Sequence, residues 1–177
     1  RFYPDKVKGE GFFLACFQKT EPENERRFKE GINEKINAKE KDILKDWCTL
    51  DDRLLIKEQS SFFLMPQSVS IAYLTLHKYL HIMYKGIYLG EIMNNKLIPS
   101  HSLALSMKVS EKIPVEELDY TMAIEYLQKK PLQISEAKQG WNIARYHKRN
   151  LGWMNVLPNR INNYYPKGLR ILKQSAH

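Results

Sequence analysis

Two apolar segments near the end of the chain, residues 141–146 and 151–156, flank four polar residues. Short apolar segments joined by so short a polar turn predict a β-hairpin. A third apolar segment at 169–172 is expected to be the strand that closes the sheet. Trp141 and Trp153 are then best explained as core residues, because a small β-barrel needs large side chains to fill it.

The sequence before this hairpin alternates short helical and strand-like patterns. The apolar spacing and the capping residues predict four helices: one over 38–48 capped by Asn37, one over 70–80, one after Ser100 and one capped by Asp119. They also predict strands over 54–56, 62–65 and 115–118. A strand–turn–strand with Gly86 at the turn is predicted over 82–89. Helices and strands in this order predict an α+β fold.

Residues 12–17 are apolar on both alternating faces, which is typical of a central strand covered by helices on each side. No other part of the chain supplies a βαβ sheet for this strand, so we expect it to be the last strand of a domain that is mostly missing. The start at Arg1 rather than at Met is the start expected of a fragment. The expected organisation is that terminal strand in 1–20, a charged connector in 21–46, a small α+β module in 47–98 and a barrel-type module in 99–177.

The positive charge is concentrated at the C-terminus. The net charge is +8, and the residues from Ala137 onward contain no Asp or Glu. They contain eight bases, which are Lys138, Arg145, Lys148, Arg149, Arg160, Lys167, Arg170 and Lys173. The rest of the chain has as many acids as bases, so this one module predicts a polyanionic partner.

No motif for catalysis or metal binding is present. His77 and His81 have a spacing compatible with a metal ion, but no neighbouring Cys or Glu completes a site, and a polar helix edge explains them better. Glu116, Glu117 and Asp119 fit a strand end and a helix cap better than an acid–base pair. We therefore expect no catalytic residue, no metal site and no cofactor in this chain.

Cysteine content and hydropathy favour a cytoplasmic location. Cys16 and Cys48 are too few for a disulfide framework and are predicted to be small core residues. No apolar run approaches the ~20 residues that cross a bilayer. No signal peptide is visible at the N-terminus.

The basic tail interleaves bases, aromatic rings and amides. Bases neutralise phosphates, aromatic faces stack on unpaired bases, and asparagine amides pair with base edges. The tail therefore predicts an RNA-binding surface. Its candidate residues are Arg145, Lys148, Arg149, Asn155, Asn159, Arg160, Asn162, Asn163, Tyr164, Tyr165, Lys167 and Arg170.

Several sequence motifs resemble the Nol/Nop/Sun family of RNA cytosine-5 methyltransferases. Residues 1–6 and 9–15 are similar to the end of the family's catalytic domain. Residues 99–105 and 118–127 are similar to the C-terminal extension of the RsmF-type bacterial branch. The motifs at 140–141, 151–153 and 162–170 are similar to that branch's PUA-like RNA-binding domain. The chain departs from the branch at 128–131 and at 154–155.

This resemblance implies a longer enzyme that transfers a methyl group from S-adenosylmethionine to carbon 5 of a cytosine in ribosomal RNA. The family's nucleophile is a cysteine preceded by proline, whereas Ala15 precedes Cys16 and Trp47 precedes Cys48. The chain alone is expected to be inactive. Its expected role is to position ribosomal RNA for the missing N-terminal catalytic domain.

Two other functions remain open from the sequence. The basic tail could bind an acidic protein partner as a scaffold, or the chain could be an independent small RNA-processing enzyme.

Overall fold

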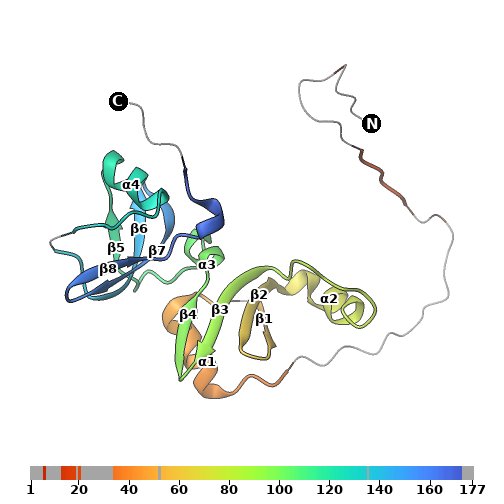
Figure 1. Ribbon diagram of the computed structural model, residues 1–177. Coiled ribbons are helices and arrows are strands. Elements are labelled where there is room, and N and C mark those ends of the chain that lie inside the picture. The colour runs from red at the N-terminus through yellow and green to blue at the C-terminus, as the bar shows by residue number, and fades with distance from the viewer. Residues whose placement is uncertain are drawn as a thin grey trace.

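The structure is a computed structural model that describes residues 6, 13–18, 20, 34–51, 53–134 and 136–172 (Figure 1). Helices and two four-stranded sheets alternate along these residues, which confirms the α+β class. The elements are α1 (Ala38–Trp47), β1 (Arg53–Glu58), β2 (Ser61–Pro66), η1 (Gln67–Val69), α2 (Ser70–Leu76), β3 (Ile87–Met93), β4 (Lys96–Pro99), α3 (His101–Leu105), β5 (Val115–Glu117), α4 (Tyr120–Leu127), β6 (Gly140–Tyr146), β7 (Arg149–Leu157), β8 (Arg160–Asn163) and η2 (Lys167–Leu169).

The first sheet is an antiparallel meander in the order β1-β2-β3-β4. The predicted strand–turn–strand over 82–89 is wrong, because β3 begins only at Ile87 and its hairpin turns at Asn94 and Asn95. Both asparagines have positive φ, 50° and 58°, as a two-residue hairpin turn requires. Gly86 instead lets the chain pass close to the backbone of β2, because a Cβ at this position would lie 2.4 Å from the Leu64 carbonyl oxygen.

The second sheet has the order β5-β6-β7-β8, with β5 parallel to β6 and the other pairs antiparallel. The predicted hairpin is confirmed as β6–β7, with its turn at His147 and Lys148. The predicted closing strand at 169–172 is wrong, because the polar segment β8 pairs with β7 instead. Among the described residues the sheet is open, with β5 and β8 at its edges, and forms no closed barrel.

The predicted helix caps are confirmed. Asn37 and Glu40 form a capping box on α1, and the side chains of Ser100 and Asp119 accept hydrogen bonds from the first turns of α3 and α4. The helix predicted over 70–80 ends at Leu76, and Tyr79 and Leu80 are exposed.

One core connects the two sheets. Phe62, Leu89 and Leu103 belong to the same buried cluster as Ile143 and Trp153. In Figure 1, α3 lies between the two sheets, which matches its contacts with β3 and β7. A second cluster packs α4 against the opposite face of β6 and β7.

The apolar N-terminal segment does not form the predicted strand in the part that the structure describes. Residues 13–18 have no assigned secondary structure, and Phe12 lies outside the described residues. Phe13, Leu14 and Phe17 are exposed. Cys48 is buried as predicted, whereas the prediction for Cys16 is wrong, because that side chain is exposed. None of the described helices is long and apolar enough to span a membrane.

Candidate nucleic-acid interface

The predicted RNA-binding residues lie in separate parts of the second sheet and its C-terminal extension. Arg145, Lys148 and Arg149 lie at the β6–β7 turn, whereas Asn159 and Arg160 lie at the β7–β8 turn. Strand β7 joins the two turns, and its nine residues span roughly 30 Å. The predicted residues therefore do not form one compact site.

The bases at the β6–β7 turn have an acidic neighbour. Arg145 Nε donates to Glu117 Oε2 at 2.7 Å, and the Lys148 backbone N–H donates to Glu117 Oε1 at 3.1 Å. The Arg145 hydrogen bond and the Lys148 N–H hold the pKa of Glu117 below its ordinary value. The tail contains no acid of its own, but the parallel pairing of β5 with β6 places Glu117 opposite Arg145, so part of this positive charge is compensated from outside the tail.

Asn163 and Tyr165 hold the segment after β8 against α4. Asn163 Nδ2 donates to the Tyr126 carbonyl oxygen at 2.8 Å, and Asn163 Oδ1 accepts from the Tyr165 backbone N–H at 2.9 Å. The Tyr165 ring packs edge-on against Tyr126, with centroids 5.5 Å apart. Both side chains therefore have a structural role, whatever else they contact.

Asn155, Asn162 and Tyr164 lie on the opposite face of the sheet. Asn155 of β7 pairs with Trp141 of β6 on one side and with Asn162 of β8 on the other. Residues directly opposite each other in an antiparallel pair share a face. Tyr164 follows β8 and packs against the Trp141 ring, with centroids 4.5 Å apart. The structure thus brings three of the predicted residues together beside a tryptophan.

Four bases gather where α4 ends. Lys129 has a left-handed φ of 61° and closes the helix, with its N–H bonded to the Tyr126 carbonyl and the Lys130 N–H bonded to that of Glu125. The Lys129 ammonium donates to the carbonyl oxygens of Asn163 and Tyr165.

The chain then returns to this end of the helix, where the Ile171 N–H bonds to the Leu127 carbonyl at 3.0 Å. This contact brings Lys167 and Arg170 to the end of α4. Burial, and then the charge of Lys167, lower the pKa of Lys129.

We call Lys129, Lys130, Lys167 and Arg170 the α4-end bases. Within the described part of the chain, no carboxylate pairs with any of them. The sequence predicted only Lys167 and Arg170, since nothing local indicates that residues about 40 positions apart meet.

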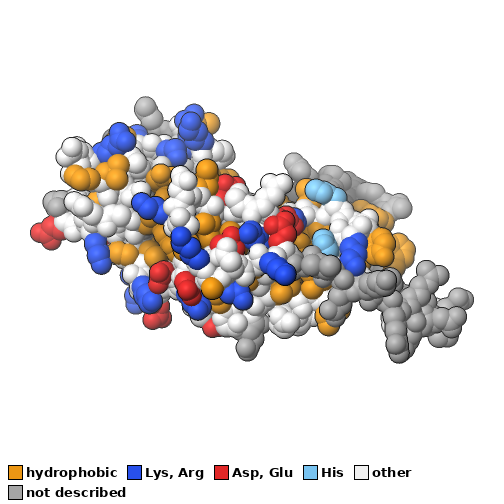
Figure 2. All heavy atoms as spheres, turned by 90° about the horizontal axis from the view of Figure 1, so that it is seen from below, with side chains coloured by type: hydrophobic (Ala, Val, Ile, Leu, Met, Phe, Trp, Pro, Cys, Tyr) orange, Lys and Arg blue, Asp and Glu red, His pale blue; other side chains and the backbone are white. Residues whose placement is uncertain are grey.

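Figure 2 shows a related charge pattern on the underside of the molecule. Acidic and basic side chains alternate over the middle of this face. Acidic side chains are scarce over the upper part of the left-hand lobe, where Lys and Arg lie beside hydrophobic side chains. This lobe is the one that carries β5–β8 in Figure 1.

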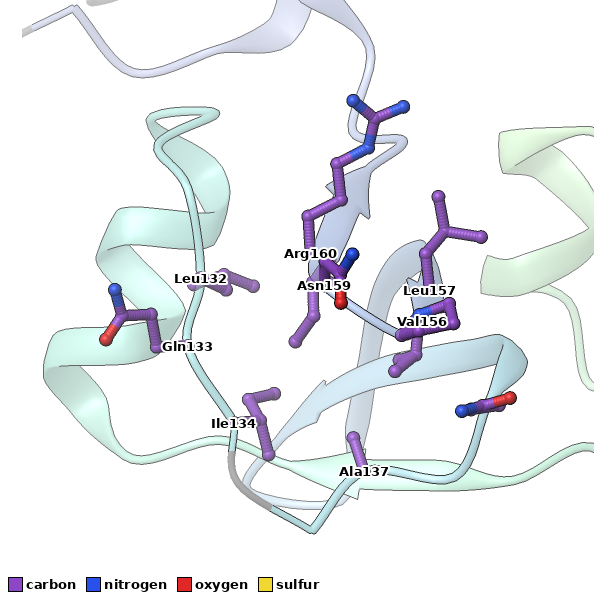
Figure 3. A pocket seen from close by; sticks show the side chains of 11 residues that line it. Leu132, Gln133, Ile134, Ala137, Val156, Leu157, Asn159 and Arg160 are labelled. Carbon is purple, nitrogen blue, oxygen red and sulfur yellow. The ribbon is translucent and has the colours of Figure 1, made fainter.

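A groove of about 610 Å³ separates the segment after α4 from the β7–β8 turn. In Figure 3, Leu132 and Ile134 come from the first wall, while Val156 and Asn159 come from the second. Gln133 points away from Arg160. Asn159 and Arg160 line this groove, and Arg160 also shares its sheet face with Asn162, two residues further along β8.

Among the described residues, no three His, Cys, Asp or Glu side chains are grouped so that they could hold a metal ion. His77 Nδ1 is bonded to the Leu74 carbonyl oxygen at 2.9 Å, and its ring stacks on Tyr73. This arrangement fits the helix-edge interpretation of His77.

Two family models match the chain. The model described as RsmF rRNA methyltransferase first C-terminal domain matches residues 38–107, which include the first sheet. The model described as Methyltransferase RsmF PUA domain matches residues 114–171, which include the second sheet. No curated protein matches the chain.

Proposed function

Because the chain belongs to the RsmF-type rRNA methyltransferases, of which it carries the first C-terminal domain and the PUA domain, we propose that it binds ribosomal RNA and positions it for cytosine-5 methylation. The catalytic domain of the same protein is then its partner, and rRNA processing in the cytoplasm is its setting. We keep the organisation proposed from the sequence, with the end of the catalytic domain in 1–20, the connector in 21–46 and modules in 47–98 and 99–177, although residues 13–18 form no strand here.

The α4-end bases are the observation that carries this proposal. A group of like charges without carboxylate partners is favourable only when an anion approaches it, and RNA phosphates supply such charge. Lys129 is already held by two carbonyl oxygens, so its ammonium is fixed in place before RNA arrives. The bases at the β6–β7 turn contribute less net charge, because Glu117 lies among them.

S-adenosylmethionine is assigned to the catalytic domain and not to these residues. The glycines that the structure describes, at 86, 90, 140, 152 and 168, lie in strands, in the irregular segment just before β3 and in a short 3-10 helix. None of them forms the loop between a strand and an α-helix that such a cofactor needs. We propose that this chain binds and orients the RNA, while the catalytic domain binds the cofactor.

Salt-dependent binding tests the proposal. The affinity of the chain for a ribosomal RNA fragment should fall with salt, with a log–log slope near −3 if about four phosphates are neutralised at 0.7–0.9 each. The triple variant Lys130→Ala, Lys167→Ala, Arg170→Ala should bind more weakly and flatten the slope by about 2 to 3. Lys39→Ala, Lys41→Ala, Lys45→Ala on the exposed side of α1 is a matched control that removes equal charge and should leave the slope nearly unchanged.

Other outcomes would favour the other functions. Failure of the chain to bind RNA at low salt would contradict the proposal. Retention of an acidic protein partner in the presence of excess RNA would favour the scaffold. Turnover of RNA by the isolated chain would favour an independent enzyme.

A further inference from the structure

The asparagines of the second sheet differ in how their amides are used. Asn142 Nδ2 donates to two backbone carbonyls, Asn150 Nδ2 donates to the Ala104 carbonyl, and the Asn163 amide makes the two bonds described above. By contrast, the side chains of Asn155 and Asn162 make no hydrogen bond to any residue that the structure describes. Three amides thus stabilise the fold, and two are left available.

These two available amides are neighbours on one face. Asn155 and Asn162 pair directly across β7 and β8, so their side chains stand about 5 Å apart on the same side of the sheet. Both are half-buried. Two adjacent amides, each with a donor and an acceptor, can pair with the polar edge of a ligand held against the sheet.

Aromatic rings lie beside the amides. Trp141 is directly opposite Asn155, and Tyr164 packs on Trp141. Tyr164 is 42% exposed, although it contacts another ring. The Trp141 indole N–H makes no hydrogen bond to a described residue, whereas Trp153 Nε1, in the core, donates to the Ser100 carbonyl at 2.6 Å. Trp141 therefore presents an unused donor at the rim of the core.

The first domain covers only part of this face. Trp47 of α1 packs edge-on against Trp141 and Trp153, with centroids 6.1 and 5.7 Å away. Asp46 and Lys112, which lie beside Trp47 and Trp141, form an ion pair with each other at 3.4 Å. The surface beyond Trp141 is thus aromatic and amide-rich, and Arg160, two residues before Asn162 in β8, is a base on the same face.

We propose that Trp141, Asn155, Asn162 and Tyr164 form a platform that binds one or two unpaired RNA bases. This inference rests on the proposed RNA binding and assigns the base contacts to a face distinct from the α4-end bases. A base stacks on the exposed side of Tyr164, and the two asparagine amides pair with its edge. A base inside a duplex has neither its face nor its pairing edge free, so the platform selects single-stranded RNA.

The four platform side chains carry no charge, which distinguishes them from the α4-end bases. Phosphate contacts release counterions and depend on salt, whereas stacking and amide pairing do not. Loss of the platform should therefore lower affinity by the same factor at every salt concentration. Loss of the α4-end bases should instead change the slope.

The experiment compares a single-stranded and a fully paired RNA of equal length, bound to the whole chain by fluorescence anisotropy across a salt series. Tyr164→Ala, and separately Asn155→Ala with Asn162→Ala, should weaken single-strand binding about five- to 150-fold, the range for one stacked base. Duplex affinity and the salt slope should stay as in the wild type. Tyr164→Phe keeps the ring and should bind normally. Gln133→Ala, which removes an exposed amide elsewhere on the domain, is the matched control.

Several results would overturn the platform. They are an unchanged single-strand affinity in both variants, an equal loss for single strand and duplex, or a changed salt slope. A protein ligand whose binding is lost in these variants, while RNA binding persists, would assign the face to a protein instead. If the wild-type chain binds no RNA of either kind, the proposed function itself fails. The asparagine variants remove no hydrogen bond of the fold, so they keep the test valid if Tyr164→Ala unfolds.

Discussion

At the scale of single residues, His101 couples pH to stability. Its ring packs edge-on against Tyr165, its Nδ1 is buried without a hydrogen-bond partner, and burial lowers its pKa below the ordinary value. The unfolded chain therefore binds a proton at a pH where the folded chain does not. Stability should fall as the pH drops below about 6.5, the ordinary pKa of histidine.

Urea unfolding of the wild type and of His101→Phe at pH 7.5 and pH 5.5 tests this coupling. The wild type should lose more stability between the two pH values than the variant does. His81→Gln, on an exposed histidine, should behave as the wild type. Equal pH dependence in the wild type and in His101→Phe would contradict the assignment.

The structure leaves no room for a side chain at position 152. Gly152 has a φ of 152°, and a Cβ there would lie 2.4 Å from the Tyr126 hydroxyl oxygen. That hydroxyl donates to the Trp153 carbonyl at 3.0 Å, so it cannot move away without losing its partner. Gly152→Ala should lower the free energy of unfolding by about 1–3 kcal/mol, the usual cost of overpacking.

A double-mutant cycle separates the contact from the backbone strain. In a Tyr126→Phe background the hydroxyl is gone, so Gly152→Ala should cost less, as measured by urea unfolding. An equal cost in both backgrounds would attribute the whole effect to the backbone.

At the scale of elements, the β6–β7 turn carries an unusual residue. His147 and Lys148 both have positive φ, 46° and 60°, and a two-residue turn of this kind favours glycine at its second position. Lys148→Gly should therefore stabilise the fold by about 0.5–1 kcal/mol. The bond to Glu117 comes from the backbone N–H of Lys148 and survives the change.

Thermal unfolding measures the stabilisation, and RNA binding measures the loss of charge. Asn95→Gly at the corresponding turn of β3–β4 is the control, because it relaxes the same conformation without removing a base. Both variants should be stabilised, and only Lys148→Gly should bind RNA more weakly. A destabilised Lys148→Gly would mean that the lysine side chain itself supports the hairpin.

The elements that sequence predicts well are those fixed by neighbouring residues. The caps at Asn37, Ser100 and Asp119 follow from side chains that bond within three residues. The errors concern pairing at a distance. Strand β8 contains Arg160 and two asparagines, so its apolar content is low, and only its pairing with β7 makes it a strand.

For the candidate interface too, the sequence predicts local composition better than contacts between distant residues. The sequence identified the basic and aromatic composition of the tail, and the placement of each side chain required the fold. Glu117 reaches Arg145 only because β5 and β6 are parallel. Lys129 joins Lys167 only because the chain returns to α4. Asn155 and Asn163 look alike in sequence, yet they face opposite sides of the sheet.

At the scale of the whole molecule, the two matched domains share a core. Trp47 of the first domain contacts Trp141 and Trp153 of the second, and α3 packs against strands of both sheets. Small domains that share a buried cluster unfold as one cooperative unit, since neither can expose its half of the cluster alone.

Trp47→Ala should therefore destabilise both domains together. Removing this large, partly buried ring should lower the free energy of unfolding by about 3 kcal/mol. The transitions followed by far-ultraviolet circular dichroism and by tryptophan fluorescence should coincide in the wild type and shift together in the variant. Two separate transitions in the wild type would show that the domains unfold independently. In that case the α1 contact would serve mainly to orient the PUA domain, and Trp47→Ala would alter RNA binding more than stability.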